Sequence, residues 1–317
     1  MGEFELIDRF FRRPARHQPL GIGDDCAILA PRPGMQLAVS TDLLLEGRHF
    51  LSTVAPARLG HKALAVNLSD LAACGARPIA FTLALALPQS DEAWLEAFAR
   101  GLLALADEHG CELVGGDTTR GPLAVCITVF GEVPAGQALL RSGAQPGDEV
   151  WASGTLGQAR LALEAFRGRV LLPAELFDTA RRRMEVPTPR VALGQGLRGV
   201  ATAAIDLSDG LMGDLGHVLT QSRVGARLHV DELLGLLPGA EALPEAQRLE
   251  CVLGGGDDYE LLFTAPAAQH ALVLERAAGA GTPVRCIGRI EAEPGLRLVD
   301  GQGRPVAARF ASFDHFA

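Results

Sequence analysis

The stretch Pro56-Ala-Arg-Leu-Gly-His-Lys-Ala-Leu-Ala-Val-Asn-Leu-Ser-Asp-Leu-Ala-Ala-Cys74, with Ile79-Ala-Phe-Thr-Leu-Ala-Leu-Ala-Leu87 close behind it, predicts a helix that leads into a strand. The helical pattern starts at Pro56 and reaches Cys74, and Gly75 and Pro78 are residues that typically end a helix. Ile79 to Leu87 alternates as a strand does. A helix and a strand in this order are the building units of an α/β protein.

Helical and strand-like patterns also alternate along the rest of the chain. Phe4, Ile7, Phe10 and Phe11 recur at helical spacing and predict a short amphipathic helix near the N-terminus. The other predicted helices are 91–109, 157–167, 174–184, 188–198, 210–222 and 267–279. The other predicted strands are 26–29, 37–40, 113–114, 124–133, 150–152, 203–207, 259–264, 284–290 and 296–299. The fold class predicted from this order is α/β, with α+β character.

The length and one local change in composition predict two domains. At 317 residues the chain is longer than a single hydrophobic core usually supports. Between residues 134 and 148 Gly and Pro become frequent and the periodicity is lost, which is typical of a domain boundary. We place the division at Gly136, so that residues 1–136 form one domain and residues 137–317 the other.

The composition, 48% apolar and 21% charged, predicts a soluble globular protein. The longest apolar stretch, 79–87, is far shorter than the roughly 20 residues of a membrane span. Glu3, Glu5 and Asp8 stand where a signal peptide has a basic start. We therefore expect the protein in the cytoplasm, without a membrane partner.

The six cysteines carry no pattern of a metal site or a disulfide framework. No Cys-x-x-Cys pair occurs, and no His stands at zinc-finger spacing. We expect the thiols to be reduced and mostly buried, as free Cys usually is in a reducing compartment.

The charged residues exclude several classes of function. The net charge of −9 argues against a nucleic-acid surface, which needs clustered Lys and Arg. Lys62 is the only lysine, and its surroundings lack the second glycine and the hydroxyl residue of a Walker A loop. The protein-kinase motifs are missing as well. An ATP site based on a lysine is therefore excluded.

Six acidic motifs share a position beside glycine or at the end of an apolar run, where side chains emerge at the edge of a sheet. They contain Asp24-Asp25, Asp42, Asp70, Asp117, Asp206 with Asp209, and Asp257-Asp258. Each motif alone is also typical of a tight turn or a helix N-cap. Two carboxylates about 4 Å apart repel by roughly 4 kcal/mol at an effective dielectric of 20, so a converging set needs cations. Oxygen ligands without His or Cys select Mg²⁺, which substrate phosphates typically complete.

A polyphosphate site also needs groups that bind the phosphate oxygens, and glycines and a few cationic or amide side chains can supply them. Glycine lets the backbone approach a ligand, and backbone N–H groups bind phosphate oxygens. Arg141 offers a forked donor for the same anion, although an exposed surface position is equally compatible with the sequence. Lys62, Asn67 and Asp70 fit one polar edge of a helix, where we expect Lys62 to support the Asp70 ligand. The Gly154–Gly157 turn fits either an anion site or an ordinary turn.

Eight motifs in order carry a resemblance that covers the whole chain. They are Gly21-Ile-Gly-Asp-Asp-Cys26, Ser40-Thr-Asp42, Lys62 to Ala73, Gly115-Gly-Asp-Thr-Thr-Arg-Gly-Pro122, Arg141-Ser-Gly143, Ala204-Ile-Asp-Leu-Ser-Asp-Gly-Leu211, Gly255-Gly-Asp-Asp-Tyr-Glu-Leu261 and Phe313-Asp-His-Phe316. Together they resemble the bacterial thiamine-monophosphate kinase family, which belongs to the ATP-binding superfamily of aminoimidazole ribonucleotide synthetase.

This resemblance implies a fold, a reaction and a set of site residues. The fold is a two-domain aminoimidazole ribonucleotide synthetase-like fold, with an N-terminal α/β domain that binds ATP and Mg²⁺ and forms a homodimer, and a C-terminal α/β domain that contributes to the active site. The reaction is the ATP-dependent phosphorylation of thiamine monophosphate (TMP) to thiamine diphosphate in thiamine biosynthesis. The implied ligands of several Mg²⁺ ions are Asp25, Ser40, Thr41, Asp42, Asp70, Asp117, Asp206 and Asp209. The implied ATP contacts are Gly116, Asp117, Arg141 and Ser208, and the implied TMP contacts are His49, Glu260 and Phe313.

The chemistry of the acceptor predicts a mechanism without a general base. A phosphomonoester with a second pKa near 6 is already largely a dianion at neutral pH, so its oxygen can attack directly. No motif places a Ser, His or Cys nucleophile beside an activating base, and we expect direct in-line transfer. The alternatives are another ATP-dependent enzyme of the same superfamily, such as aminoimidazole ribonucleotide synthetase or selenophosphate synthetase, and a non-catalytic sensor of Mg²⁺ and nucleotide. Cys26 precedes an apolar run and is expected in a core, unlike a reactive cysteine.

Overall fold

The computed structural model describes residues 2–306, which divide into two compact units. Residues 2–71 and 76–136 form the first, and residues 72–75 with 137–306 form the second. No helix in this described range is long and apolar enough to cross a membrane.

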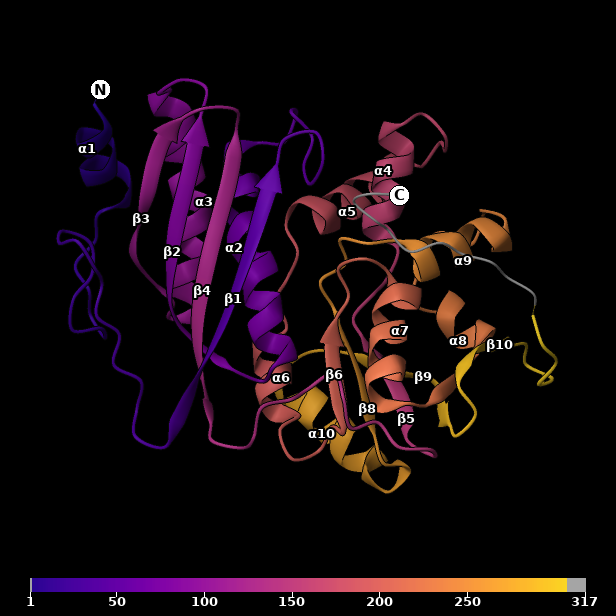
Figure 1. Cartoon of the computed structure of the whole chain (residues 1–317). Helices are drawn as coiled ribbons and strands as arrows, with labels where there is room; N and C mark the ends of the chain where they lie inside the picture. Colours follow the sequence, from indigo (N-terminus) through magenta and orange to yellow (C-terminus); the bar gives the residue numbers. More distant parts are fainter. Residues whose placement is uncertain (1, 307–317) are drawn as a thin grey trace. The chain divides into compact units, whose positions relative to one another are not determined.

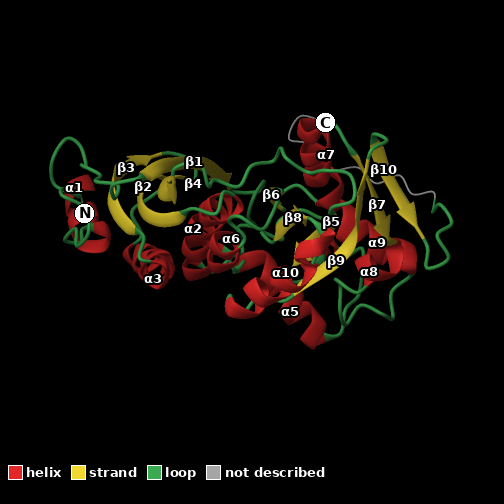
Figure 2. Ribbon diagram, turned by 90° about the horizontal axis from the view of Figure 1, so that it is seen from below, coloured by secondary structure: helices red, strands yellow, loops and turns green. Residues whose placement is uncertain are grey.

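The first unit is a four-stranded sheet with two long helices. Its elements are α1 (Glu3–Leu6), η1 (Ile7–Phe11), β1 (Met35–Leu45), α2 (Pro56–Ala73), β2 (Arg77–Leu87), α3 (Glu92–His109), β3 (Glu112–Arg120) and β4 (Ala124–Pro134). The strand order is β1-β4-β2-β3, in which only β2 and β3 run parallel. Both α2 and α3 lie on one face of this sheet (Figures 1 and 2).

Local signals in the sequence explain where α3 begins and how closely it packs. The carboxylate of Asp91 accepts the N–H groups of Ala93 and Trp94 and caps the helix. A Cβ at Gly101 would lie 1.8 Å from the carbonyl oxygen of Ala57, in α2. Glycine at this position therefore lets the two helices approach each other at backbone distance.

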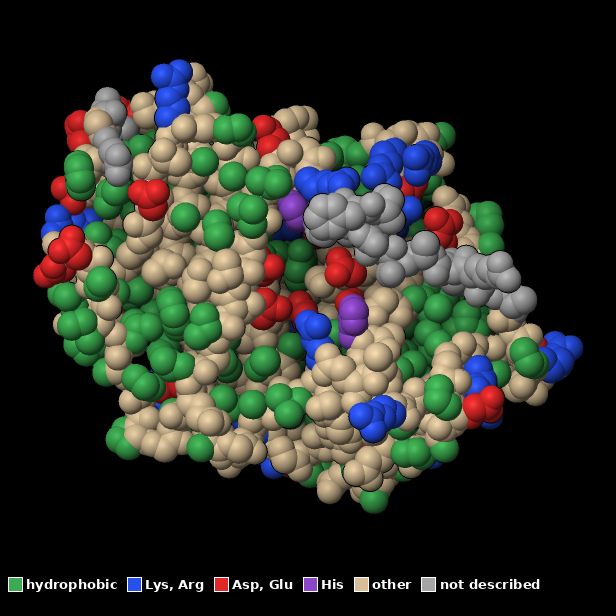
Figure 3. All heavy atoms as spheres, in the orientation of Figure 1, with side chains coloured by type: hydrophobic (Ala, Val, Ile, Leu, Met, Phe, Trp, Pro, Cys, Tyr) green, Lys and Arg blue, Asp and Glu red, His purple; other side chains and the backbone are tan. Residues whose placement is uncertain are grey.

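The face of the sheet that α2 and α3 do not cover carries exposed apolar side chains. The burial of β1 alternates, and Leu37, Val39, Leu43 and Leu45 are all exposed, between 39% and 58%. Apolar side chains spread over this face in the space-filling view (Figure 3). This row of exposed apolar side chains is a candidate for an interaction surface.

Glu132 in β4 connects two arginines at one end of this sheet. Its side chain is buried, and it accepts hydrogen bonds from Arg77, at 2.7 and 3.1 Å, and from Arg32. Burial alone would raise the pKa of Glu132, but the hydrogen bonds from Arg77 and Arg32 outweigh it and lower the pKa below its ordinary value.

We expect the Glu132→Gln substitution to destabilise the protein by about 1–3 kcal/mol at neutral pH, because charge-assisted hydrogen bonds of two arginines are lost. A carboxyl whose folded pKa is lowered stabilises the fold above its unfolded pKa, and this contribution disappears as the pH falls through the folded value. The difference between wild type and variant in urea unfolding should therefore shrink under acid conditions below the ordinary glutamate pKa of 4.5. A difference that stays constant with pH would contradict this assignment.

The second unit surrounds a six-stranded sheet. Its elements are β5 (Glu149–Ser153), α4 (Gln158–Phe166), α5 (Ala174–Glu185), α6 (Val191–Gly196), β6 (Ala203–Asp206), α7 (Leu211–Ser222), β7 (Gly225–His229), α8 (Val230–Leu234), α9 (Glu245–Gly254), β8 (Leu261–Ala265), η2 (Ala267–Gln269), α10 (His270–Gly279), β9 (Val284–Glu291) and β10 (Gly295–Val299). The strand order is β10-β7-β9-β5-β8-β6. Helices α7 and α10 lie on opposite faces of the sheet (Figure 2). Val150, Leu161, Ile205, Leu215 and Ile287 lie in the core of this unit.

Most of the predicted elements are confirmed, and four expectations need correction. Residues 26–29 form no strand, since only Ile28 makes an isolated bridge, to Leu20. The prediction missed β7, α8 and α9, whose stretches are short or lack clear periodicity. Cys26 is exposed and does not lie in a core, and of the six thiols only Cys111 and Cys251 are buried. The acidic motifs also differ from expectation, because Asp42 and Asp117 lie within β1 and β3 and not beyond the end of a strand.

Candidate active site

In the first unit, β1 and α2 bring four predicted polar residues together. The hydroxyl of Ser40 donates to the carboxylate of Asp70, and the side-chain oxygen of Asn67 accepts the backbone N–H of Asp42 at 3.2 Å. Asn67 is fully buried and also donates to the carbonyl oxygen of Ala63, within its own helix. Helix α2 thus carries Asp70 and fixes the backbone at Asp42 through Asn67. The side chains of Ser40, Asp42 and Asp70 offer oxygen atoms, which are the ligands that Mg²⁺ prefers.

The other predicted ligands of this unit lie apart from that group. The Thr41 side chain points to the opposite face of the sheet, where its hydroxyl lies 2.9 Å from that of Thr128. Asp117 on β3 pairs with Ala84, one of the exposed residues of β2, and so shares that opposite face. Because β4 and β2 separate β1 from β3, Asp42 and Asp117 are about 14 Å apart across the sheet.

His49 follows β1 in a short loop that the buried Lys62 supports. The ring nitrogen Nδ1 of His49 accepts the N–H of Leu45 at 3.0 Å. The ammonium group of Lys62, on α2, donates to the carbonyl oxygen of His49 at 3.0 Å. The lone lysine therefore fixes the loop that carries His49, while its pairing with Asp70 stays a prediction.

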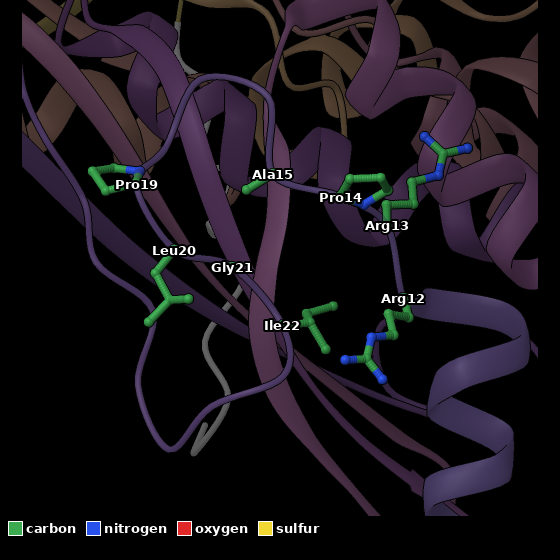
Figure 4. Close-up of a pocket in the computed structure, with 8 residues that line it drawn as sticks. All are labelled: Arg12, Arg13, Pro14, Ala15, Pro19, Leu20, Gly21 and Ile22. Carbon is green, nitrogen blue, oxygen red and sulfur yellow. The ribbon is translucent and has the colours of Figure 1, made fainter.

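Asp25 lies in the exposed segment between η1 and β1. Its backbone N–H donates to the carboxylate of Asp24 at 2.9 Å. A pocket of about 600 Å³ lies in the same segment and is lined by Arg12, Arg13, Pro14, Ala15, Pro19, Leu20, Gly21 and Ile22 (Figure 4). Its two arginines already form ion pairs, with Asp8 and Asp107. Since no predicted site residue lines this pocket, we do not assign the active site to it.

In the second unit, two predicted motifs run side by side. The segment after β6 pairs with the segment before β8, because the N–H of Asp257 donates to the carbonyl of Ser208 at 2.9 Å and that of Tyr259 to the carbonyl of Leu207 at 2.8 Å. A Cβ at Gly256 would lie 2.4 Å from the carbonyl oxygen of Ser208, so the contact requires glycine. The motif at Asp206–Asp209 and the glycine-rich motif thus form one structural feature.

The backbone of this feature is strained. Asp257 and Tyr259 have φ angles of 67° and 49°, in the left-handed region that non-glycine residues rarely adopt. The Tyr259 hydroxyl donates to the Asp257 carboxylate at 3.0 Å. Each such conformation costs on the order of 1–3 kcal/mol, and strain of this kind concentrates at functional sites.

Asp214, which the sequence did not single out, holds the loop that carries Ser208 and Asp209. It lies in the first turn of α7, is buried, and accepts the N–H groups of Asp209 and Gly210, both at 3.1 Å. Burial raises the pKa of Asp214 to about 7, although these N–H groups favour the charged form. An acidic residue in a first helical turn is common, so no sequence signal distinguishes this role.

The backbone N–H groups of the Gly154–Gly157 turn donate to other groups of the protein. The N–H of Gly157 donates to the buried carboxyl of Asp258 at 2.7 Å, and those of Gly154 and Leu156 donate to carbonyl oxygens of Pro283 and Leu236. These three N–H groups therefore hold the turn against neighbouring segments, as in an ordinary structural turn. Burial raises the pKa of Asp258 well above its ordinary value.

Glu260 is fully buried beside this turn, whereas Arg141 is exposed. A Cβ at Gly154 would lie 2.0 Å from the Glu260 carboxylate. The carboxylate contacts Ser153, Arg183 and Arg190, two of which are arginines that the sequence did not single out. Arg141 follows Leu140, whose carbonyl accepts the N–H of Ala204 at the start of β6. Phe313 lies outside the described residues.

The oxygen atoms of Ser40 and Asp70 fit Mg²⁺ as part of a coordination shell shared with phosphate. Within residues 2–306 no group of three or more His, Cys, Asp or Glu side chains is arranged to hold a metal ion. Ser40 and Asp70 nevertheless offer adjacent oxygen atoms, and Mg²⁺ is usually bound by one or two carboxylates together with substrate phosphates. The donor set is therefore compatible with ions that arrive with a nucleotide.

Comparison with known proteins covers nearly the whole chain. Residues 23–133 match the model of the AIR synthase related protein N-terminal domain, and residues 145–301 match that of the C-terminal domain. Thiamine-monophosphate kinase of Salmonella typhimurium is 46% identical over 100% of this chain and 98% of its own length. The enzyme of the same name from Haemophilus influenzae is 40% identical, with the same shares covered.

Solved structures agree with this result. The thiamine-monophosphate kinase of Stenotrophomonas maltophilia has a TM-score of 0.83 at 44% identity and covers 96% of both chains. AaThiL complexed with AMPPCP and TMP has a TM-score of 0.76 at 30% identity, covering 90% of this chain and 89% of its own. The hydrogenase maturation protein HypE of E. coli, at 20% identity and a TM-score of 0.79, shares the fold. The two-domain α/β fold predicted from the sequence is thus confirmed.

Proposed function

Because the chain belongs to the thiamine-monophosphate kinase family, we propose that it transfers the γ-phosphoryl group of ATP to thiamine monophosphate and so makes thiamine diphosphate. The observation that carries this proposal is the similarity over the full chain to kinases of that name, one structure of which holds AMPPCP and TMP. We also propose that the enzyme acts in the cytoplasm, because ATP, its proposed nucleotide substrate, is present in that compartment.

The roles of the site residues follow from the resemblance. The two groups of polar residues described above support Ser40, Asp42 and Asp70 in the first unit and Ser208 and Asp209 in the second. The first domain, residues 1–136, binds ATP and Mg²⁺, and the second, residues 137–317, completes the active site. The proposed Mg²⁺ ligands are Asp25, Ser40, Thr41, Asp42, Asp70, Asp117, Asp206 and Asp209. The proposed ATP contacts are Gly116, Asp117, Arg141 and Ser208, and the proposed TMP contacts are His49, Glu260 and Phe313.

The mechanism that we propose is direct in-line transfer. Bound Mg²⁺ supplies charge neutralisation between two anionic substrates. The first unit contributes oxygen ligands held by α2, and the second contributes those of the loop before α7. Their role in this mechanism is to bind and orient the substrates. A general base is unnecessary, because the acceptor phosphate is already a nucleophile near neutral pH. Trapping of a ³²P-labelled enzyme after incubation with ATP alone would contradict this mechanism.

The release of ADP in the presence of Mg²⁺ tests the function. We expect ADP only when both ATP and TMP are present, with thiamine diphosphate formed in equal amount. A non-catalytic sensor would bind both ligands without releasing ADP. Another ATP-dependent enzyme of the same superfamily would release ADP with a different acceptor.

We further propose that the enzyme forms a homodimer through the uncovered face of the first sheet. The exposed apolar residues Leu37, Val39, Leu43 and Leu45 support this interface, since a second copy would bury them. Asp117 lies on the same face, so that a second copy would approach it as well.

We expect sedimentation equilibrium to give a dimer for the wild type and a monomer for Val39→Lys, because the twofold symmetry places the new charge in the interface twice. The control is Leu171→Lys, which changes a residue that is 95% exposed in the second unit and should leave the dimer intact. A wild-type monomer, or a Val39→Lys dimer of unchanged affinity, would contradict the proposed interface.

A further inference from the structure

The segment between β4 and β5 carries Arg141 in irregular backbone, and hydrogen bonds fix this backbone just before the arginine. The carbonyl oxygen of Leu140 accepts the N–H of Ala204, in β6, at 2.8 Å. One residue earlier, the N–H of Leu139 donates to the carbonyl oxygen of Cys74 at 3.1 Å. The chain therefore enters Arg141 from a fixed position in the second unit.

The last residue of α7, Ser222, fixes the backbone on the other side of the arginine. Its hydroxyl oxygen accepts the N–H groups of Gly143 and Ala144, at 3.1 and 3.2 Å. Gly143 has a φ of 121°, in the region that favours glycine, and a Cβ there would lie 2.3 Å from the carbonyl oxygen of Thr202. Arg141 thus lies between two anchors, and a substitution of Ser222 can remove the second without changing the backbone sequence around the arginine.

The side chain of Arg141 has no support of its own from the protein. Arg141 is exposed, and within residues 2–306 its guanidinium group forms no ion pair or hydrogen bond. The position from which this group can reach a ligand is therefore set by the backbone alone. A backbone that is already ordered lowers the entropy cost of binding, because less of the segment has to be immobilised with the ligand.

Helix α7 connects this segment with the loop that precedes the helix. At its N-terminal end Asp214 accepts the N–H groups of Asp209 and Gly210, and at its C-terminal end Ser222 binds the segment of Arg141. The helix has 12 residues and is about 18 Å long. Two segments that carry proposed site residues therefore share one rigid support, which keeps their separation constant.

We propose that Ser222 is a positioning residue for Arg141 in nucleotide binding. Its two hydrogen bonds hold the backbone after Arg141 in a fixed place relative to the loop before α7, which carries Ser208, the other proposed ATP contact of the second unit. This inference rests on the proposed kinase function and adds a residue that acts on the nucleotide only through Arg141.

The test measures the binding of AMPPCP and of TMP, each with Mg²⁺, to the full chain. Wild type is compared with Ser222→Ala, Arg141→Ala and the double variant. We expect AMPPCP to bind about fivefold more weakly to Ser222→Ala and at least about tenfold more weakly to Arg141→Ala. The double variant should match Arg141→Ala within about twofold, because Ser222 has no effect once the guanidinium is gone. TMP should bind all variants within about twofold of wild type.

The control is Thr220→Ala, which removes a hydroxyl two positions earlier that donates to the carbonyl oxygen of Gly216 within α7. It should bind both ligands as wild type does, and thermal unfolding shows that it and Ser222→Ala are folded.

Three results would overturn the inference. They are unchanged AMPPCP binding in Ser222→Ala, equal weakening of TMP in that variant, and a loss in the double variant that equals the full product of the two single losses. Unchanged AMPPCP binding in Arg141→Ala would refute the role of Arg141 itself and the inference with it. Wild-type protein that releases no ADP with TMP would instead refute the proposed function, while AMPPCP binding would still test Ser222.

Discussion

The substitution Asp70→Asn is expected to reduce turnover by at least about 10³-fold while the fold stays intact. An amide in place of the carboxylate removes the negative charge that attracts Mg²⁺, and lost stabilisation of the transferring phosphoryl group costs several kcal/mol. The fold should survive because the amide oxygen can still accept the hydrogen bond from Ser40. In Mg²⁺-free buffer the variant should melt at the same or a higher temperature, since repulsion among carboxylates is relieved.

Two measurements separate a metal defect from a folding defect. ADP release is measured against Mg²⁺ concentration, and thermal unfolding is recorded with and without Mg²⁺ and AMPPCP. We expect ligand to raise the melting temperature of wild type but not of Asp70→Asn. The control is Asp107→Asn, which removes an exposed acid that pairs with Arg13 and should behave as wild type. If Asp70→Asn keeps wild-type turnover, Asp70 is not a metal ligand.

The periodic parts of the fold could be predicted because local pattern and tertiary environment agree. The helix at 56–74 and the strand at 79–87 each have a long, regular pattern, and α2 and β2 match them closely. Residues 26–29 have the composition of a strand but no adjacent strand to extend the pairing, and they make one bridge only. Strand β7 has five residues and depends on its neighbours β9 and β10, which are more than fifty residues distant in sequence.

The candidate site could be predicted as a list of residues but not as an arrangement. The alternation of a strand places Ser40 and Asp42 on the helix side of β1 and Thr41 on the other, and this depends on which face α2 covers. Arg190 follows a proline and resembles a surface arginine, although its guanidinium reaches the buried carboxylate of Glu260, which lies 70 residues away just before β8. Such long-range pairs leave no local pattern in a single sequence.

The substitution Gly116→Ala is expected to destabilise the first unit by about 3 kcal/mol or more and to abolish nucleotide binding. Gly116 has a φ of 148°, in the region that favours glycine, and a Cβ there would lie 1.9 Å from the carbonyl oxygen of Leu83. Leu83 is its partner on β2, so the overlap involves backbone that cannot move without breaking the pairing of β2 and β3. Strain of this size is among the largest effects of single substitutions.

The adjacent substitution Gly115→Ala is a closely matched control. A Cβ at Gly115 would meet only the methyl group of Thr82, at an ordinary distance of 3.8 Å, and we expect a change of less than about 1 kcal/mol. Urea unfolding and AMPPCP binding are measured for both variants. If Gly115→Ala binds AMPPCP normally and Gly116→Ala does not, the conformation at Gly116, and not the mere loss of a glycine in this motif, shapes the nucleotide site. Equal stability of the two variants would show that β3 does not approach Leu83 as closely as described.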